Sequence, residues 1–321
     1  MPAHQVGADA CRMHTKNYAV ALPAAAGLVA VLLLTACGGG TSTSTSTSTS
    51  SHPSAGTTTS PAAAEAASTV AVTDQEDSNW AGYVVSSGAT AKTSFSAVSG
   101  SWTQPTVDCA AGSPAHSAFW IGLGGYTGDH LEQTGTSADC SATGHASYSA
   151  WYELVPAAQV PVTMTVRPGD RLSARVSVSG TTVTISLSDL TRHATFSKQL
   201  QMSSPTVSSA EWIAEAPSRC LSSSSQDCHI LSLADFGGVT FTGASATAAG
   251  RTGSITSDLG RVSALTLEAN PSFGRLYATA AQADASPGAL SGDGSSFTVT
   301  WQRPEIQMPA PPVIVSGPIY N

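Results

Sequence analysis

A glutamine and a glutamate in two strand-like segments are the side chains of this sequence whose types and surroundings suit chemistry. Gln133 lies in the stretch LEQTG, and Glu215 lies in the stretch AEWIAEAP. Successive side chains of a strand point to opposite faces, so Glu211 and Glu215 share a face, whereas Glu132 opposes Gln133. Gln133 and Glu215 can look into one groove if their strands lie close together, a condition that spacing alone does not decide.

The motifs of several familiar hydrolases are absent from the sequence. It contains no G-x-S-x-G nucleophile elbow, no H-E-x-x-H zinc motif, and no Asp-Thr-Gly or Asp-Ser-Gly of the aspartic proteases. Five histidines beyond the N-terminal region show no spacing typical of a metal site: His116, His130, His145, His193 and His229. We therefore expect no metal and no other cofactor, which leaves carboxyl and amide groups as the candidates for chemistry.

The N-terminal residues 1–37 have the features of an export signal. Arg12 and Lys16 precede an apolar run, which closes with Leu-Thr-Ala followed by Cys37. This ending resembles a bacterial lipobox, in which the cysteine is lipidated and becomes the mature N-terminus. A plain cleaved signal and a retained membrane span are the alternatives. We expect a bacterial protein that is extracellular or at the cell surface, held there by a lipid on Cys37.

Residues 38–73 are rich in Thr, Ser, Gly and Pro, a composition typical of a flexible tether. All six tryptophans follow it, from Trp80 to Trp301, which predicts one folded domain over residues 74–321. The net charge of -8 argues against nucleic acid and against membrane contact other than through the lipid, and we expect a monomer. Charged residues make up only 11%. Few ion pairs suit acidic surroundings, although a biased genome composition explains the same value.

Four cysteines lie in the predicted domain, namely Cys109, Cys140, Cys220 and Cys228. An even number in an exported chain predicts two disulfides. Three pairings are possible. A short loop between Cys220 and Cys228 is the natural choice, and it leaves Cys109 with Cys140. No C-x-x-C spacing supports a metal site instead.

The hydrophobic pattern of the domain has a period of two almost throughout. Apolar and polar residues alternate over 162–166, 172–178 and 183–187, and a Ser-Gly turn separates the last two runs. Two such runs around a turn predict a β-hairpin. Many antiparallel strands with one apolar face each must bury those faces against one another. The sequence therefore predicts an all-β protein built as a two-sheet antiparallel sandwich.

Six short motifs occur in an order and spacing that resembles the glutamic peptidases, also called eqolisins. The resemblance covers about residues 74–270, and each motif alone would be weak because Trp and Gly are common in strands. The motifs are SNWAGY (78–83), FWIGLGG (119–125), LEQTG (131–135), YSAWYELVP (148–156), AEWIAEAP (210–217) and LADFGGVTF (233–241).

The resemblance implies a sandwich with about seven strands in each sheet and two catalytic residues. Gln133 corresponds to the catalytic glutamine, with Glu132 inserted before it, and Glu215 corresponds to the catalytic glutamate. Further residues of the substrate groove are implied at Trp120, Glu153, Trp151 and Asn79. The two tryptophans are alternatively core residues, and Asn79 alternatively anchors the first strand.

Peptide hydrolysis explains why a site would combine an acid with an amide. A carboxylate with an ordinary pKa of about 4.3 can take a proton from water and later return it to the leaving nitrogen. An amide NH2 does not titrate, so it can donate to the developing oxyanion even at acidic pH; such a donor is worth about 2.7–4 kcal/mol. The resemblance thus implies an acid-acting endopeptidase with polypeptide substrates.

Two other functions remain open at this stage. The first is a non-catalytic module that binds carbohydrate or protein in a tryptophan-lined groove. The second is a glycosidase, which needs two carboxyl groups about 5–9.5 Å apart. A glycosidase would use Glu211 or Glu153 as the partner of Glu215, and it leaves Gln133 without a role.

Overall fold

The computed structural model consists of β-strands joined by turns and loops. The expected export signal with Cys37 and the expected tether up to residue 69 lie outside the residues it describes. The described residues are 70–87, 94–110, 112–220, 228–256, 258–268 and 283–303. Within these ranges there is no helix, and hence none long and apolar enough to cross a membrane.

The strands of the described residues have the following bounds: β1 (Val72–Asp77), β2 (Trp80–Ser86), β3 (Phe95–Thr103), β4 (Ala115–Gly124), β5 (Leu131–Cys140), β6 (Ala146–Val155), β7 (Val160–Val162), β8 (Arg171–Ser179), β9 (Thr182–Asp189), β10 (Ala194–Gln201), β11 (Ser209–Glu215), β12 (Ser218–Cys220), β13 (Cys228–Ile230), β14 (Gly238–Ala248), β15 (Arg251–Gly253), β16 (Arg261–Leu267), β17 (Asp284–Pro287) and β18 (Phe297–Gln302).

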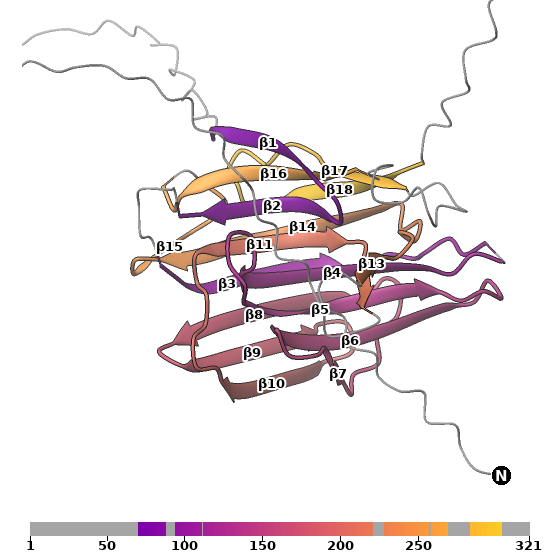
Figure 1. The fold of residues 1–321 in the computed structure, drawn as a ribbon, viewed down its shortest axis with the longest axis horizontal. Coiled ribbons are helices and arrows are strands. Elements are labelled where there is room, and N and C mark those ends of the chain that lie inside the picture. The colour runs from indigo at the N-terminus through magenta and orange to yellow at the C-terminus, as the bar shows by residue number, and fades with distance from the viewer. Residues whose placement is uncertain are drawn as a thin grey trace, which may run out of the picture. The chain divides into compact units, whose positions relative to one another are not determined.

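One 16-stranded sheet contains all of these strands except β12 and β13, which pair with each other. Its order is β10-β9-β8-β3-β14-β18-β17-β16-β2-β11-β4-β5-β6-β7, with β1 paired to β16 and β15 paired to β14. In Figure 1, β16, β17 and β18 lie at the top of the view, and β8, β9 and β10 lie at the bottom. The described pairs are antiparallel apart from β1 with β16. The all-β, largely antiparallel prediction is confirmed.

The strands do not separate into the two sheets of about seven that the sequence analysis expected. β16 pairs with β17 at Leu267 and Ala285, so the hydrogen-bonded order continues from one half of the sheet into the other. The halves pack face to face, with β3 against β4 and β5 against β8. Near the far ends, Lys198 Nζ on β10 donates to the Tyr152 hydroxyl on β6 at 2.9 Å. The sheet is nearly closed and barrel-like, because pairing at the corner satisfies backbone groups that two free edges would expose.

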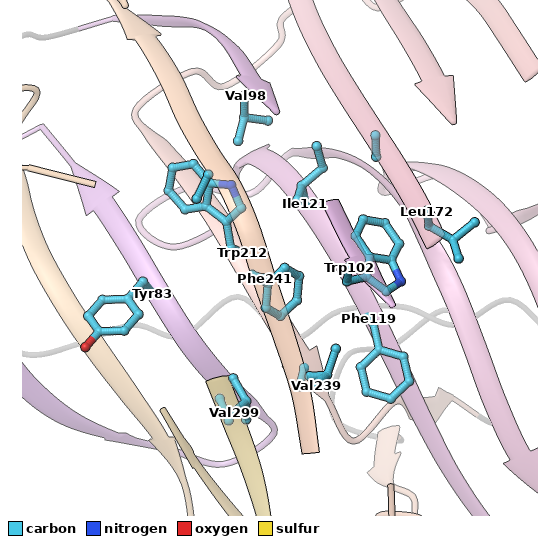
Figure 2. Packing of buried hydrophobic residues seen from close by; sticks show 14 of the residues in the cluster. Tyr83, Val98, Trp102, Phe119, Ile121, Leu172, Trp212, Val239, Phe241 and Val299 are labelled. Atoms are coloured by element: carbon cyan, nitrogen blue, oxygen red, sulfur yellow. The ribbon is translucent and has the colours of Figure 1, made fainter. Parts of the chain in front are cut away.

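The core lies on the inner face of this curved sheet. β8 and β9 alternate between buried and more exposed positions, as the period of two predicts. Two buried indoles on this face have acceptors for their N–H groups: Trp102 Nε1 donates to Thr136 Oγ1 at 3.0 Å, and Trp212 Nε1 donates to the Ser99 carbonyl at 2.8 Å. Figure 2 shows aromatic and aliphatic residues packed in this core, among them Tyr83, Val98, Trp102, Phe119, Ile121, Leu172, Trp212, Val239, Phe241 and Val299.

The strands around β11 are buried on both faces. Every residue of β2 and β11 is buried. Strict alternation of apolar and polar residues fails here because neither face of these strands meets water. On the face opposite the core lies a second apolar cluster, formed by Trp80, Val84, Ala118, Trp120, Leu131, Trp151, Val155, Ile213 and Leu265. This second cluster surrounds the candidate site.

One disulfide of the structure joins Cys109 to Cys140, the last residue of β5. Cys228 is also disulfide-bonded. Its neighbour in the β12–β13 register is Cys220, whose side chain lies outside the description. The pairing of Cys109 with Cys140 agrees with the arrangement that the spacing of the four cysteines favours.

Replacing both Cys109 and Cys140 by Ser is expected to lower the free energy of unfolding by about 2–4 kcal/mol. The bridge spans a sequence separation of 31, so its loss frees a long loop in the unfolded chain. Urea denaturation of the natural and doubly substituted proteins measures the difference. An unchanged midpoint and slope would contradict a stabilising role for this bridge.

Candidate active site

The register of four neighbouring strands brings polar side chains into one row. Glu211 on β11 is opposite Gly122 on β4, Gly122 is opposite Gln133 on β5, and Gln133 is opposite Glu153 on β6. Residues of such a row point to the same face of a sheet. Glu215 lies four positions after Glu211 and therefore shares that face. β5 and β11 both flank β4, so Gln133 and Glu215 lie on strands separated by one strand and on one face.

Two glycines make room for the large side chains of this face. A Cβ atom on Gly135 would lie 2.6 Å from the Cβ of Trp120, so only glycine lets that side chain pack closely over β5. A Cβ on Gly122 would lie 2.7 Å from Leu131 Cδ1 and 3.2 Å from the Cβ of Gln133. The glycines of FWIGLGG and LEQTG therefore bring strands β4 and β5 close enough to assemble the site.

The Glu215 carboxyl is held by two side-chain donors. Trp120 Nε1 donates to Glu215 Oε2 at 2.7 Å, and Asn79 Nδ2 donates to Glu215 Oε1 at 3.1 Å. Glu215 is 2% exposed, and Trp120 is fully buried. The structure thus places Trp120 and Asn79, both expected in the substrate groove, directly on the glutamate. Their donors set the direction of both carboxyl oxygens.

The Gln133 amide is oriented by a neighbouring carboxyl. Gln133 Nε2 donates to Glu153 Oε2 at 2.7 Å, and Gln133 is fully buried. This contact places the nitrogen of the amide on the Glu153 carboxyl. Glu153 therefore fixes which end of the amide faces the rest of the site.

Tryptophan rings form the apolar surroundings of these groups. Trp80 and Trp120 pack edge to face, with 5.0 Å between ring centroids. Trp151 is 3% exposed, and its Nε1 donates to Ser137 Oγ at 2.9 Å. Trp151 lies in the second apolar cluster with Trp80 and Trp120. It contributes to the low-polarity environment of the carboxyl groups and makes no hydrogen bond to them in the described structure.

Burial raises the pKa of both carboxyl groups of the site. The pKa of Glu215 is raised to about 8, chiefly by desolvation; the hydrogen bond from Trp120 lowers it, and the charge of Asp77 raises it. Desolvation also raises the pKa of Glu153 to about 8, with a further increase from the charge of Glu215 and a decrease from the Gln133 hydrogen bond. Both groups therefore hold protons at acidic pH in this structure.

Three further acidic residues near the site have structural surroundings that the sequence did not reveal. Glu211 and Glu132 are fully buried, and desolvation raises the pKa of Glu211 well above its usual range and that of Glu132 to about 8. The sequence suggested Glu211 only as the partner of Glu215 in a glycosidase. No motif of the sequence singles out Asp77; its place two residues before Asn79 is the local signal for a turn.

The described residues contain no group of three or more His, Cys, Asp or Glu side chains placed to hold a metal ion. The polar groups of the site are instead carboxyl, amide and indole groups.

Comparisons with known proteins relate the chain to one family of peptidases. The sequence profile of the peptidase A4 family matches residues 78–286. Aspergillopepsin-2 of Aspergillus niger is 30% identical over 207 residues, which cover 56% of this chain and 67% of that protein.

Two solved structures have a similar fold. Scytalido-glutamic peptidase with a peptide-based transition state analog superposes with a TM-score of 0.55 and 25% identity, over 70% of this chain and 98% of that one. SCP-B, an eqolisin in complex with the tripeptide Ala-Ile-His, has a TM-score of 0.52 and 24% identity over the same shares of the two chains, and this likeness concerns the fold alone.

The fold and these matches define a hydrolase of the glutamic peptidase class, an endopeptidase by its relatives. The chain belongs to the peptidase A4 family.

Proposed function

We propose that the protein hydrolyses peptide bonds of polypeptides at acidic pH with Glu215 and Gln133 as its catalytic dyad. The observation that carries this proposal is the shared sheet face of the two residues, linked through Glu153, which bonds to Gln133 and interacts electrostatically with Glu215. Neither residue has another evident task in packing a core. A family of glutamic peptidases supplies the matching reaction.

Glu215 acts as the general base and then as the general acid. It removes a proton from a water molecule as the water oxygen attacks the carbonyl carbon, and it gives that proton to the nitrogen as the C–N bond breaks. The base must be ionised, and burial is the largest cause of its raised pKa. The hydrogen bonds from Trp120 and Asn79 stabilise the carboxylate and lower this pKa, so they favour the ionised base.

Gln133 stabilises the negative charge that forms on the carbonyl oxygen. Its amide carries two N–H bonds, and the contact with Glu153 occupies one of them at most. In the proposed reaction an N–H of this amide donates to the oxyanion, while Glu153 keeps the amide nitrogen in a fixed place. An oriented, uncharged donor needs no reorganisation during the reaction.

The cellular setting is part of the same proposal. The signal-like N-terminus, the lipobox ending at Cys37 and the Thr/Ser-rich tether support an exported bacterial enzyme held at the cell surface by a lipid. Polypeptides are its partners there, and the acidic net charge disfavours nucleic acid. We expect it to act as a monomer.

Mass spectrometry of a denatured protein library, incubated with the purified protein at pH 4 and pH 7, tests the proposed activity. We expect new peptide termini at pH 4. Retained binding to polysaccharide or protein without any new termini would favour a binding module instead. Release of reducing sugar from a polysaccharide would favour a glycosidase.

Replacing Gln133 by Ala is expected to lower kcat by about 10²–10³-fold, because one oxyanion donor is lost. The exposed Gln201 on β10 provides a matched control, since its replacement by Ala removes an amide far along the sheet order from the site. Steady-state kinetics on one cleaved peptide measures both. Equal kcat values for the Gln133 variant and the natural protein would contradict the oxyanion role.

A further inference from the structure

The segment that joins β1 to β2 crosses from one side of β16 to the other, and we call it the crossing. β1 pairs with β16 in parallel and β2 pairs with β16 in antiparallel fashion, over overlapping residues of β16. The two strands therefore lie on opposite sides of β16, and only Ser78 and Asn79 connect them. This connection passes over the end of β16, where the Glu268 N–H donates to the Asp77 carbonyl at 2.9 Å.

The Asp77 side chain fixes the backbone of this crossing through hydrogen bonds. Its Oδ1 accepts hydrogen bonds from the backbone N–H groups of Asn79 and Trp80, each at 3.0 Å, and the residue is 6% exposed. An aspartate that accepts from the backbone two and three residues later fixes a turn. The turn ends at Asn79, whose carbonyl accepts from the Ala216 N–H at 2.9 Å. Asn79 is thus tied to the residue directly after Glu215.

The turn also determines the position of the Asn79 side chain relative to Glu215. Asn79 Nδ2 donates to Glu215 Oε1 at 3.1 Å, so the position of the turn decides where that donor lies. Without the Asp77 carboxylate, the backbone N–H groups of Asn79 and Trp80 would lose their acceptor in a buried place. The crossing would then adopt another path, and Asn79 would move with it.

We propose that Asp77 is a positioning residue for the catalytic Glu215: it fixes the crossing so that Asn79 holds one carboxyl oxygen of the base. This inference rests on the proposed peptidase function for its kinetic consequence, but its structural part does not. Asp77 touches no reacting atom and acts through Asn79 and through its charge.

The acidic surroundings of Glu215 support the electrostatic part. Asp77 from the crossing raises the pKa of Glu215, after the larger effects of burial and of the Trp120 hydrogen bond. From β6, Glu153 interacts electrostatically with Glu215, and Glu211 lies on the same face of the sheet from β11 itself. The Asp77 charge also raises the pKa of the Tyr126 hydroxyl. Among these acidic groups, Asp77 is the one whose charge raises the pKa of Glu215.

Two substitutions separate position from charge. Asp77→Asn keeps an acceptor oxygen for the turn but removes the charge, whereas Asp77→Ala removes both. We expect Asp77→Asn to keep a kcat close to that of the natural protein and to move the acid limb of the kcat/KM profile to lower pH, because Glu215 then ionises more readily. We expect Asp77→Ala to lower kcat by about 10–100-fold, because the base is misplaced.

Asp189 provides a matched control in another part of the sheet. Its Oδ1 accepts from the backbone N–H groups of Thr191 and Arg192 at 2.9 and 3.0 Å, which repeats the geometry of Asp77 in the β9–β10 turn. Asp189→Asn should leave both kcat and the pH profile unchanged. Thermal unfolding of each variant shows whether it is folded.

A second measurement does not depend on activity. The carboxyl carbon of Glu215, labelled with 13C and assigned by its absence in Glu215→Gln, is titrated by NMR in the natural protein, Asp77→Asn and Asp189→Asn. A lower pKa of Glu215 in Asp77→Asn alone supports the inference, and equal values in all three overturn it. If the natural protein cleaves no peptide, the peptidase proposal fails while this titration still decides the role of Asp77.

Discussion

Glu215→Gln is expected to lower kcat for peptide hydrolysis by about 10²–10⁴-fold, the usual contribution of a general acid–base group. The amide that replaces the carboxyl can still accept from Trp120 Nε1, which donates to Glu215 Oε2 at 2.7 Å. It cannot take a proton from water. The fold should therefore persist while the reaction is lost. Initial rates on a peptide cleaved by the natural protein, together with near-UV circular dichroism, measure both effects.

Two control variants make this result specific. Glu76→Gln changes an exposed glutamate of β1 and should retain full activity. Glu211→Gln changes the other glutamate of β11 that shares the face of Glu215, and it too should retain activity if Glu215 is the base. Loss of activity in Glu211→Gln with normal activity in Glu215→Gln would exchange the two assignments. Full activity in both would remove the proposed base from the mechanism.

The free energy of unfolding is expected to fall by several kcal/mol as the pH rises from about 4.5 to 8. Burial raises the pKa of Glu132, Glu153 and Glu215 to about 8 and that of Glu211 well above its usual range. In the unfolded chain these groups ionise near pH 4.5, whereas the folded protein keeps their protons. Their stabilising contribution is therefore complete below pH 4.5 and is lost as the pH rises towards 8.

Each proton retained only by the folded state changes the unfolding free energy by about 1.4 kcal/mol per pH unit within this window. Urea denaturation at pH 4, 5.5 and 7 measures the slope. Glu211→Gln should make the slope shallower by about one proton, because an amide does not titrate, while the exposed Glu76→Gln should not change it. A stability that is constant or increases over this range would show that these glutamates are ionised in the folded protein.

The buried glutamates also affect the pH range that suits the protein. The low content of charged residues, 11%, suggested that acid would remove few ion pairs. The buried glutamates add a second reason, because at neutral pH they would place negative charges in an apolar interior. Both features favour stability of the fold on the acidic side, although only the second one depends on the tertiary structure.

The local character of the strands could be predicted from the sequence alone. The alternation over residues 172–178 and 183–187 corresponds to β8 and β9, because the side-chain period of a strand is a property of neighbouring residues. The candidate dyad also came from the sequence, through six ordered motifs. The pairing of Cys109 with Cys140 followed from counting four cysteines and choosing the shortest loop for the other two.

The arrangement of the strands depends on contacts between residues far apart in the chain, which no local pattern contains. β11 lies between β2 and β4, and the corner between β16 and β17 joins what were expected to be two sheets. That order places Asn79 and Trp120 on the carboxyl of Glu215 and buries three other glutamates with it. Sequence thus determined which residues could do chemistry, whereas tertiary structure determined their partners and their charge, because desolvation and strand neighbours exist only in the folded protein.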